Sequence, residues 1–491
     1  MLGSLVLVWV FIFLLFLFIR TQRPKNFPPG PRPLPLFGNL FQLNITNPLK
    51  DFEKLAERYG NVYSLYIGGT PAVVLTGLKA LKEAFVNKAA DFSGRPQNLL
   101  ISHAAEGKGI VLLDYGPAWK EHRRFALMTL RNFGMGKQSM EDRILGETEH
   151  LVKRLERTAG GFLNPQTLFH DAASNIIYMV LFGIRYDYGD ETLKQYVSLF
   201  TELAKTTNGP WGMIYDTLPI LRALPLPFRK VITNFKVLKK MIASMISKHK
   251  TSRVPGEPEN FVDCYLDELD KRGDDGSFNE EQLARCVVDL HGAGTDTTSN
   301  TLLTAFLYLI THPDIQERCQ KEIDEVLEGK AHASFEDRHK MPYIQAVIHE
   351  CQRIANTAPL GVFHCTSRDT ELMGYSIPKD TVIIPNLASV LSEDGQWKFP
   401  HEFNPANFLN EQGQFEKPEA FLPFSTVFYM CAGPRMCIGE GLARMELFLI
   451  LVTLLRRFQF FWPKDAGEPD FTPVYGITLT PKPYRMGIRL R

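Results

Sequence analysis

The chain has 491 residues, of which 45% are hydrophobic, and a formal net charge of +1. This balance gives no electrostatic reason to expect nucleic-acid binding. Seven cysteines, an odd number without a Cys-x-x-Cys spacing, argue against a disulfide framework and a structural zinc site. Length alone suggests about three domains, but apolar periodicity continues almost from end to end without a low-complexity linker. One large globular unit in a reducing compartment is therefore favoured.

The N-terminus differs from this body. Residues 1–19 carry no charge and consist mostly of Leu, Val, Phe, Ile and Trp. As a helix they would span roughly 28 Å, close to the thickness of a bilayer core. Arg20, Arg23 and Lys25 follow directly, which places the remainder on the cytosolic side. A cleaved signal peptide would carry its positive charge before the apolar run, and a buried soluble helix would keep a polar face. We therefore expect an uncleaved anchor over residues 1–20.

Prolines crowd the next segment, which reads Phe27-Pro-Pro-Gly-Pro-Arg-Pro-Leu-Pro35. Proline at this density fixes an extended backbone and prevents the preceding helix from continuing. The segment is therefore predicted to be a stiff spacer. We assign residues 21–38 to this basic, proline-rich hinge and residues 39–491 to the main body.

A helix of about thirty residues is predicted to begin near Asn279 and to end at His312, before Pro313. Gly292 and Gly294 lie in its middle, and each costs about 1 kcal/mol relative to alanine. Such a cost indicates either close packing against a neighbouring helix or a local opening.

Three residues in the middle of this helix suggest proton chemistry. The hydroxyl of Thr297 is spaced to donate to the Ala293 carbonyl, which would take that carbonyl from the helix ladder and open a groove. Asp296 would then supply a carboxylate beside the hydroxyl, a pair suited to relaying protons. The alternative is that small residues allow close packing and the threonines are ordinary buried donors.

Glu350 and Arg353 place opposite charges three residues apart on one helical face. An exposed pair of this kind contributes only a few tenths of a kcal/mol. The flanking residues are apolar, so we expect partial burial, where the pair needs further hydrogen bonds to persist. We interpret it as scaffold.

The most informative segment is Ala432-Gly-Pro-Arg-Met-Cys-Ile-Gly-Glu-Gly-Leu-Ala-Arg444. A Gly-Pro turn brings Cys437 to the start of a long apolar helix, where partial positive charge and free N–H groups lower a thiol pKa. A thiolate held there can be the axial ligand of haem iron. Gly439 leaves room for a flat macrocycle, and Arg435 can bind a propionate. A buried structural cysteine is the alternative.

These segments resemble the cytochromes P-450, the haem-thiolate monooxygenases. The family's haem loop reads Phe-x-x-Gly-x-Arg-x-Cys-x-Gly, and it is matched here by Gly433, Arg435, Cys437 and Gly439. Met430 stands where the phenylalanine is expected. Pro423-Phe424-Ser425 lies further upstream, as though Thr426 to Cys431, or a frame close to it, had been inserted.

The resemblance also assigns roles to other residues. The helix over 279–312 is similar to the family's oxygen-binding helix, with its Asp–Thr pair at Asp296 and Thr297 and with Ala293 beside the haem. The family's Glu-x-x-Arg pair meets a later Pro-x-Arg-Phe, which here reads Pro405-Ala-Asn-Phe408. By the same resemblance, the side chains that would bind the haem propionates are those of Arg95, Trp119, Arg123, His364 and Arg435. The side chains of Lys120, Arg124 and Arg131 are expected to form a solvated basic face.

The resemblance implies a mainly α fold with small β-sheets, in the α+β class, holding haem b (iron protoporphyrin IX) between two long helices. It implies insertion of one dioxygen atom into a lipophilic xenobiotic, fatty acid or steroid. Electrons would come from NADPH-cytochrome P-450 reductase, with cytochrome b5 as a second donor. The expected location is the endoplasmic reticulum membrane, facing the cytosol. Apolar loops over 99–111, 358–362 and 475–478 would line the substrate pocket, and residues 211–215 and 221–228 would dip into the bilayer.

Two alternatives stay open from the sequence. A haem-thiolate isomerase or synthase would rearrange peroxides without outside electrons, and it usually has no need of the Asp296–Thr297 relay. The other alternative is a non-enzymatic membrane protein, or a variant disabled by the residues inserted before the cysteine loop. Cys431 could then compete as ligand, although it lacks the glycine and the helix start that follow Cys437.

Overall fold

The computed structural model describes residues 9, 23–133, 138–273, 276–424 and 433–491. Almost all of the predicted anchor over residues 1–20, and the inserted stretch from Thr426 to Cys431, lie outside the described residues. Within the described part of the chain, no helix combines the length and apolar character that crossing a membrane requires.

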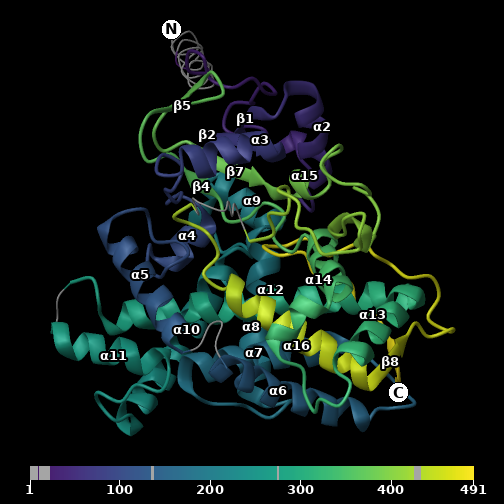
Figure 1. The fold of residues 1–491 in the computed structure, drawn as a ribbon. Coiled ribbons are helices and arrows are strands. Elements are labelled where there is room, and N and C mark those ends of the chain that lie inside the picture. The colour runs from purple at the N-terminus through teal and green to yellow at the C-terminus, as the bar shows by residue number, and fades with distance from the viewer. Residues whose placement is uncertain (1–8, 10–22, 134–137, 274–275, 425–432) are drawn as a thin grey trace.

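Helices form most of the described body (Figure 1). The α-helices are α2 (Leu49–Tyr59), α3 (Gly77–Lys82), α4 (Leu100–Ala105), α5 (Pro117–Asn132), α6 (Gln138–Glu156), α7 (Pro165–Phe182), α8 (Glu191–Thr207), α9 (Pro210–Thr217), α10 (Arg229–Ser252), α11 (Phe261–Arg272), α12 (Glu280–Thr311), α13 (Pro313–Val326), α14 (Pro342–Ala355), α15 (Leu387–Leu391) and α16 (Glu440–Arg457). Short 3-10 or π segments are η1 (Leu40–Gln42), η2 (Glu83–Asn87), η3 (Pro219–Ala223), η4 (Phe335–Lys340) and η5 (Pro405–Phe408).

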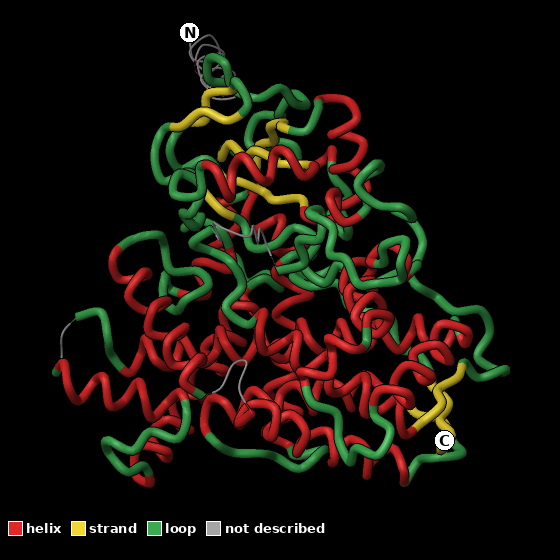
Figure 2. The backbone as a smooth tube through the Cα atoms, in the orientation of Figure 1, coloured by secondary structure: helices red, strands yellow, loops and turns green. Residues whose placement is uncertain are grey.

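The strands form three small sheets, drawn yellow in Figure 2. The four-stranded sheet has the order β1-β2-β7-β4; β2 pairs antiparallel with β1 and parallel with β7. A three-stranded sheet has the order β3-β9-β8, and β5 pairs with β6 alone. The strands are β1 (Val62–Ile67), β2 (Thr70–Thr76), β3 (Phe162–Leu163), β4 (His364–Cys365), β5 (Thr370–Leu372), β6 (Tyr375–Ile377), β7 (Val382–Asn386), β8 (Phe458–Phe461) and β9 (Met486–Leu490).

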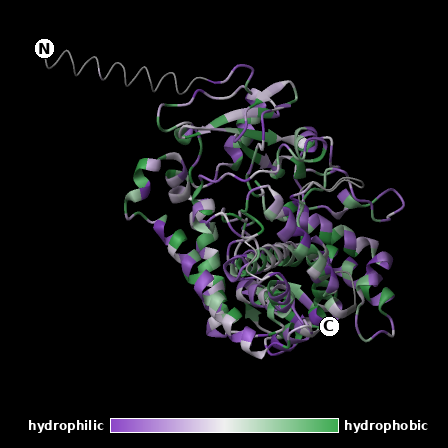
Figure 3. Cartoon of the chain, turned by 90° about the vertical axis from the view of Figure 1, so that its left-hand side faces the viewer, coloured by the Kyte–Doolittle hydropathy of each residue, from purple (hydrophilic) through white to green (hydrophobic). Residues whose placement is uncertain are grey.

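Two regions can be distinguished, a helical body and the four-stranded sheet with its neighbours near the N-terminus (Figure 2). One continuous hydrophobic core occupies the helical body, and two smaller cores cover the two faces of the four-stranded sheet. Hydrophobic residues, green in Figure 3, occur along helices and strands throughout. The predicted mainly α arrangement with small sheets is confirmed.

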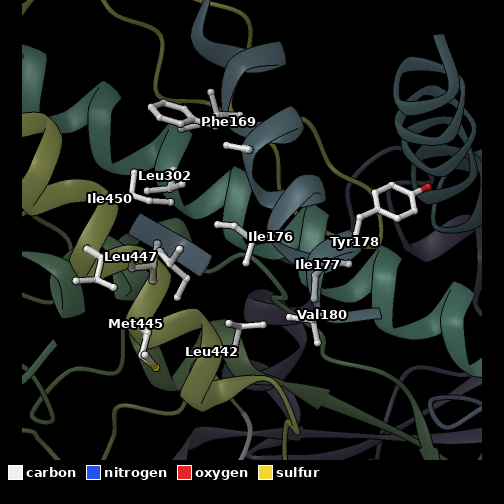
Figure 4. Packing of buried hydrophobic residues seen from close by; sticks show 14 of the residues in the cluster. Phe169, Ile176, Ile177, Tyr178, Val180, Leu302, Leu442, Met445, Leu447 and Ile450 are labelled. Atoms are coloured by element: carbon white, nitrogen blue, oxygen red, sulfur yellow. The ribbon is translucent and has the colours of Figure 1, made fainter. Parts of the chain in front are cut away.

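Helix α12 crosses the centre of the body and packs against α7, α10, α14 and α16 (Figure 1). Apolar side chains of α7, α12 and α16 meet in the core, among them Ile176, Leu302 and Leu447 (Figure 4). A Cβ on Gly292 would lie 2.0 Å from the Phe200 ring, and one on Gly294 would lie 2.4 Å from Ile177. The packing explanation is therefore correct for both glycines, because each admits a side chain of a neighbouring helix.

The predicted limits of α12 are confirmed. The Asn279 side chain accepts a hydrogen bond from the backbone N–H of Gln282 at 2.8 Å, which caps the first turn. The helix ends at Thr311, His312 is its C-cap, and Pro313 begins α13.

Two segments predicted to be connecting loops contain helices. Residues 99–111 include α4, and residues 211–215 lie within α9. Neither helix has a capping side chain of its own, although Pro210 occupies the first position of α9. A partner distant in sequence supplies the missing acceptor for α4: Asp216 Oδ1 accepts the backbone N–H of Leu100 at 2.7 Å.

Candidate functional site

Cys437 lies just before α16, whose N-cap is Gly439. Its backbone N–H donates to the Phe424 carbonyl at 3.3 Å, which ties the cysteine turn to the chain before the inserted stretch. Cys437 is the exposed one of the six described cysteines, whereas the other five are buried or half-buried.

The direction of the Cys437 pKa differs from the sequence-based expectation. Burial raises the pKa of this thiol, and the charge of Glu440 adds to that effect. The backbone N–H groups of Gly439 and Glu440, together with Arg123, act in the opposite direction. The helix N-terminus thus contributes as predicted, but desolvation outweighs it. A thiolate at this position needs a further positive partner.

A second exposed face lies in the middle of α12. Most of this helix is buried, yet Ala293 is exposed and Thr297 is half-buried. The Thr297 hydroxyl donates to the Ala293 carbonyl at 2.7 Å, as predicted. Helix α12 contacts α16 (Figure 1), the helix that Cys437 precedes.

Asp296 has partners that the sequence did not suggest. Its Oδ2 accepts a hydrogen bond from the Thr478 hydroxyl, and its Oδ1 lies 3.7 Å from Nε2 of His170 on α7. Asp296 and Thr297 are adjacent in sequence, but their hydrogen bonds go to different groups. Their shared role in proton relay therefore stays a prediction.

Arg95 is buried and Arg435 is half-buried, and each lies close enough to affect the charge of the other. Arg95 donates from Nη1 to the carbonyls of Val362 (3.1 Å) and Phe363 (2.8 Å). Arg435 donates from Nε to the Ser93 carbonyl at 2.9 Å and from Nη2 to the Leu113 carbonyl at 2.8 Å. Both guanidinium groups are thus held by neutral carbonyl oxygens.

Burial lowers the pKa of Arg95 to about 9 and the pKa of Arg435 to about 8, and each cation depresses the other one. Among the described residues, Asp114 is the one carboxylate whose charge acts on both. Its Oδ1 accepts the backbone N–H of Arg95 at 2.8 Å. Positive charge therefore exceeds negative charge around these two side chains.

Trp119 and Arg123 come from one face of α5, as their spacing predicted. Trp119 is buried and donates from its indole N–H to the Ile110 carbonyl at 3.0 Å, while the Arg435 guanidinium stacks 4.0 Å from the ring. Arg123 donates from Nη2 to the Met436 carbonyl at 2.5 Å, next to Cys437. Lys120, Arg124 and Arg131 are exposed, as expected of a solvated basic face.

His364 lies in β4, buried against the Phe85 ring. Its Nδ1 is 2.7 Å from the Phe92 carbonyl, so this nitrogen carries the hydrogen. Burial, together with the nearby Arg95 and Arg435, holds the pKa of His364 well below its usual range. The ring is therefore neutral and presents Nε2 on its other side.

These observations match the chemical requirements of haem. Its propionates are anions, and Arg95, Arg123 and Arg435 form a cationic cluster with little internal carboxylate. Its iron takes a soft sulfur ligand, and Cys437 offers one. A Cβ on Gly439 would meet only the Cys437 sulfur, at 3.8 Å, which leaves space beside it. Gly433 is required for another reason, because a Cβ there would lie 2.6 Å from the Phe85 carbonyl.

The Glu350–Arg353 pair is fully buried in α14. Both guanidinium–carboxylate contacts measure 2.7 Å, and Arg353 also donates to the carbonyls of Leu391, Pro400 and Glu402. Asn407 donates from Nδ2 to both Glu350 oxygens, at 3.2 and 3.3 Å. An amide thus occupies the position where the family pattern has arginine, and the interpretation as scaffold agrees with this geometry.

Comparison with known proteins identifies the class of protein that this fold and site define. The family model described as Cytochrome P-450 matches residues 28–488. The chain belongs to the cytochrome P-450 family, whose members are monooxygenases that bind haem through a cysteine thiolate.

Individual relatives are similar over nearly their whole length. Cytochrome P-450 2D3 of Rattus norvegicus is 42% identical over 466 residues, which cover 94% of this chain and 92% of the relative. Vitamin D(3) 25-hydroxylase of Sus scrofa is 41% identical over 494 residues, covering 99% and 98%. Cytochrome P-450 2B4 of Oryctolagus cuniculus is 38% identical over 463 residues, covering 94% and 93%.

Three polar residues near the site are not predicted by the sequence patterns. His170 and Thr478 hold Asp296, and Glu446 on α16 is buried beside Thr298 of α12. His170 and Glu446 lie in apolar helical patterns in which a single polar residue is a weak signal. Thr478 is predicted only as part of a lining loop.

Proposed function

We propose that this chain is a membrane-anchored haem-thiolate monooxygenase that uses dioxygen and electrons from NADPH-cytochrome P-450 reductase to hydroxylate or epoxidise lipophilic substrates. The observation that carries this proposal is the exposed Cys437 beside a cationic cluster, just before a helix that contacts α12, together with the Thr297–Ala293 hydrogen bond of α12. Ligand, counter-ions and a distal polar face are what a haem-thiolate reaction requires of the protein.

Each part of the site has a distinct task in this proposal. Cys437 would hold the iron, and the propionates would be held by Arg95, Trp119, Arg123, His364 and Arg435. Ala293 and Gly439 would border the two faces of the macrocycle. When bound, haem supplies activation of dioxygen and transfer of one oxygen atom to the substrate.

The remaining chemistry falls to the polar groups of α12. Reductive cleavage of dioxygen consumes two protons, so a proton donor must reach the distal side. The Thr297 hydroxyl donates to the Ala293 carbonyl, and it can pass its proton on if it releases that carbonyl. Asp296 is the neighbouring carboxylate that could replace that proton. This task favours the monooxygenase over an isomerase or synthase, which needs no proton relay.

Electrons would enter from the thiolate side. The exposed Lys120, Arg124 and Arg131 belong to a basic face that suits an acidic flavoprotein surface, and cytochrome b5 could use the same face. Screening should weaken this encounter, so reductase-supported turnover should fall as ionic strength rises. Reductase-supported turnover that does not change with ionic strength would argue against this docking face.

The membrane part of the proposal assigns residues 1–20 to an anchor in the endoplasmic reticulum, residues 21–38 to the hinge, and residues 39–491 to a cytosolic catalytic domain. Leu36 in the hinge, Phe41 after it and Ile220 in η3 are exposed apolar side chains. The β1–β2 turn of the four-stranded sheet packs closely against the end of α9 in the helical body, since a Cβ on Gly68 would lie 2.2 Å from the Thr217 carbonyl. Exposed apolar side chains of this kind support contact with lipid and entry of lipophilic substrates.

The decisive measurement is the carbon-monoxide difference spectrum of the reduced, purified protein. We expect the strongly red-shifted Soret band of thiolate-ligated haem, and Cys437→Ser should abolish it. An ordinary haem band, or none, in the wild-type protein would overturn the proposal and favour the disabled variant. Deletion of residues 426–431 would then test the insertion as the cause.

A second measurement separates the monooxygenase from the isomerase or synthase. With the thiolate band present, NADPH and reductase should support product formation from lipophilic probes such as dodecanoic acid or a steroid. Rearrangement of a lipid hydroperoxide, with no turnover from NADPH and reductase, would instead establish the isomerase class.

A further inference from the structure

A small pocket lies between α4, α10 and α12, and it shares no residue with the proposed haem-binding set. Part of its lining is apolar, from Phe235 of α10 and two alanines of α4. The rest is mostly cationic, and its positive side chains are Lys108, Lys236, Lys239 and Arg285. Four cations around one small pocket favour an anionic occupant, unless neighbouring carboxylates already neutralise them.

Two of the cations form ion pairs near the surface. Lys239 Nζ lies 2.9 Å from Oε2 of Glu106, the acidic residue of the lining. Lys239 also contacts Glu281, and the same carboxylate contacts Lys108. These four side chains are exposed or half-buried, so water screens their pairs. Lys236 is exposed and has no ion-pair partner among the described residues.

Arg285 differs from the lysines because it is buried, with 5% of its surface exposed. Its Nη2 lies 3.0 Å from Oδ1 of Asp289, one helical turn later, and its guanidinium lies 4.3 Å from the centre of the Phe235 ring. The Nε–H of Arg285 is buried and has no hydrogen-bond partner in the part of the chain that the structure describes. A buried donor without an acceptor costs free energy, so an acceptor at this nitrogen would stabilise the folded protein.

The Asp289 carboxylate is already committed to other donors. Its Oδ2 accepts the backbone N–H groups of Ile110 at 2.8 Å and of Val111 at 3.0 Å, and its Oδ1 pairs with Nη2 of Arg285. Moving this carboxylate to the Arg285 Nε would leave two backbone N–H groups unpaired. The acceptor for Nε therefore has to come from outside the chain.

An anion meets the needs of this pocket better than a water molecule does. Four lining cations are opposed by three carboxylates, Glu106, Glu281 and Asp289, which leaves an excess of one positive charge. A water would satisfy the Nε–H but not this charge. A carboxylate supplies both the acceptor oxygen and the negative charge, and its hydrogen bonds to arginine are strong. The alanines and Phe235 can contact the apolar part of an organic acid.

We propose that the pocket between α4, α10 and α12 binds a small organic carboxylate, with Arg285 as the buried donor and Lys236 as the cation at the entrance. This site is additional to the proposed function and does not depend on haem ligation. Because Phe235 covers one face of the guanidinium, the carboxylate reaches Arg285 in the plane of that group.

The test is a titration of the full-length holoenzyme with hexanoate, 13C-labelled at the carboxylate and followed by NMR at low ionic strength. 4-Phenylimidazole is present throughout to occupy the iron side of the haem site. We expect saturable binding of hexanoate that is tighter than that of acetate, because the apolar lining contacts the hydrocarbon chain, and tighter than that of inorganic phosphate.

Three outcomes of this titration would overturn the inference. One is the absence of saturable hexanoate binding, and another is binding that 4-phenylimidazole displaces, which would place the acid in the haem cavity. A preference for inorganic phosphate over both carboxylates would reject the assignment of an organic acid.

Variants locate the binding in this pocket. Arg285→Lys keeps a positive charge beside Asp289 but removes the Nε–H, so hexanoate affinity should fall about tenfold or more. Lys236→Gln removes an exposed charge and should weaken binding about two- to threefold. Lys240→Gln is the matched control, because Lys240 is another exposed lysine of α10 but does not line the pocket, and its affinity should equal that of the wild type. Equal affinities in the wild type, Arg285→Lys and Lys236→Gln would reject the inference.

A further comparison keeps the test valid if Arg285→Lys does not fold, which circular dichroism would show. Lys236→Gln and Lys240→Gln both alter the exposed surface of α10, so equal affinities in these two variants would then reject the inference. The carbon-monoxide band of the wild type reports on the proposed function separately. Hexanoate binding without the thiolate band would reject that function alone, whereas a normal band without hexanoate binding would reject this inference alone.

Discussion

Two sets of guanidinium groups in the interior of this protein have different partners. Arg353 in α14 has a carboxylate partner on its own helix, with both contacts to Glu350 at 2.7 Å. Arg435 beside Cys437 donates to the backbone carbonyls of Ser93 and Leu113, and burial lowers its pKa to about 8. Arg95 next to it is held in the same way.

The difference distinguishes scaffold from binding site. A buried cation that is already paired with a carboxylate needs no anionic ligand, and it holds helices and loops in place. A buried cation held only by neutral carbonyls remains costly, because its charge is not compensated. An anionic ligand relieves that cost, and the haem propionates are such anions. Stability and cofactor binding can therefore be altered separately.

The largest effect is expected at the scaffold. Arg353→Met leaves the Glu350 carboxylate buried and without its cation, which costs about 3–5 kcal/mol. The midpoint of thermal unfolding, followed by circular dichroism at a fixed scan rate, should fall steeply. The double variant Glu350→Gln with Arg353→Met removes both charges and should recover part of the loss. Equal midpoints for the single and double variants would contradict the role of the uncompensated charge.

A smaller effect on stability, but a clear one on cofactor content, is expected in the cationic cluster. Arg435→Met removes a charge-assisted donor to the propionates, worth about 1.5–3 kcal/mol, so haem retention should weaken roughly 10- to 100-fold. Haem-to-protein ratio and the rate of haem transfer to apomyoglobin would measure this. Arg435→Lys should be intermediate, and Arg124→Met, on the exposed face of α5, should behave as wild type. Unchanged haem retention with a lowered unfolding midpoint would place Arg435 with the scaffold.

Glu446 provides a third, gentler test, since it is a buried carboxyl without a cation. Burial raises its pKa to about 8, although the Thr298 hydroxyl lowers it in part. The unfolded value is about 4.3, so between these values the folded protein binds one proton more than the unfolded chain. Stability should therefore decrease as pH rises through this window, by at most roughly 1.4 kcal/mol per pH unit.

Glu446→Gln cannot titrate and should remove this dependence. Its unfolding midpoint should exceed that of the wild type at about pH 8 and differ little near pH 5. Glu317→Gln, on the exposed face of α13, is the control and should leave the dependence intact. A wild-type midpoint that is independent of pH would show that Glu446 is not the protonated group inferred here.

Residue spacing by itself determines much of this protein. Capping by Asn279 and termination before Pro313 define α12, the i to i−4 reach of a threonine hydroxyl gives the Thr297–Ala293 bond, and helical spacing brings Trp119 and Arg123 to one face. These features depend on neighbours within a few residues. The sequence motif around Cys437 likewise identifies the family that the comparisons confirm.

Tertiary structure decided what depends on residues distant along the chain. Thr478 and His170 reach Asp296 from 182 and 126 positions away, and no local pattern predicts such a meeting. The direction of the Cys437 pKa was likewise decided by burial, which a local argument from the helix N-terminus cannot include. Short-range hydrogen bonds can be predicted from residue spacing, whereas desolvation and long-range pairing arise only when the chain has folded.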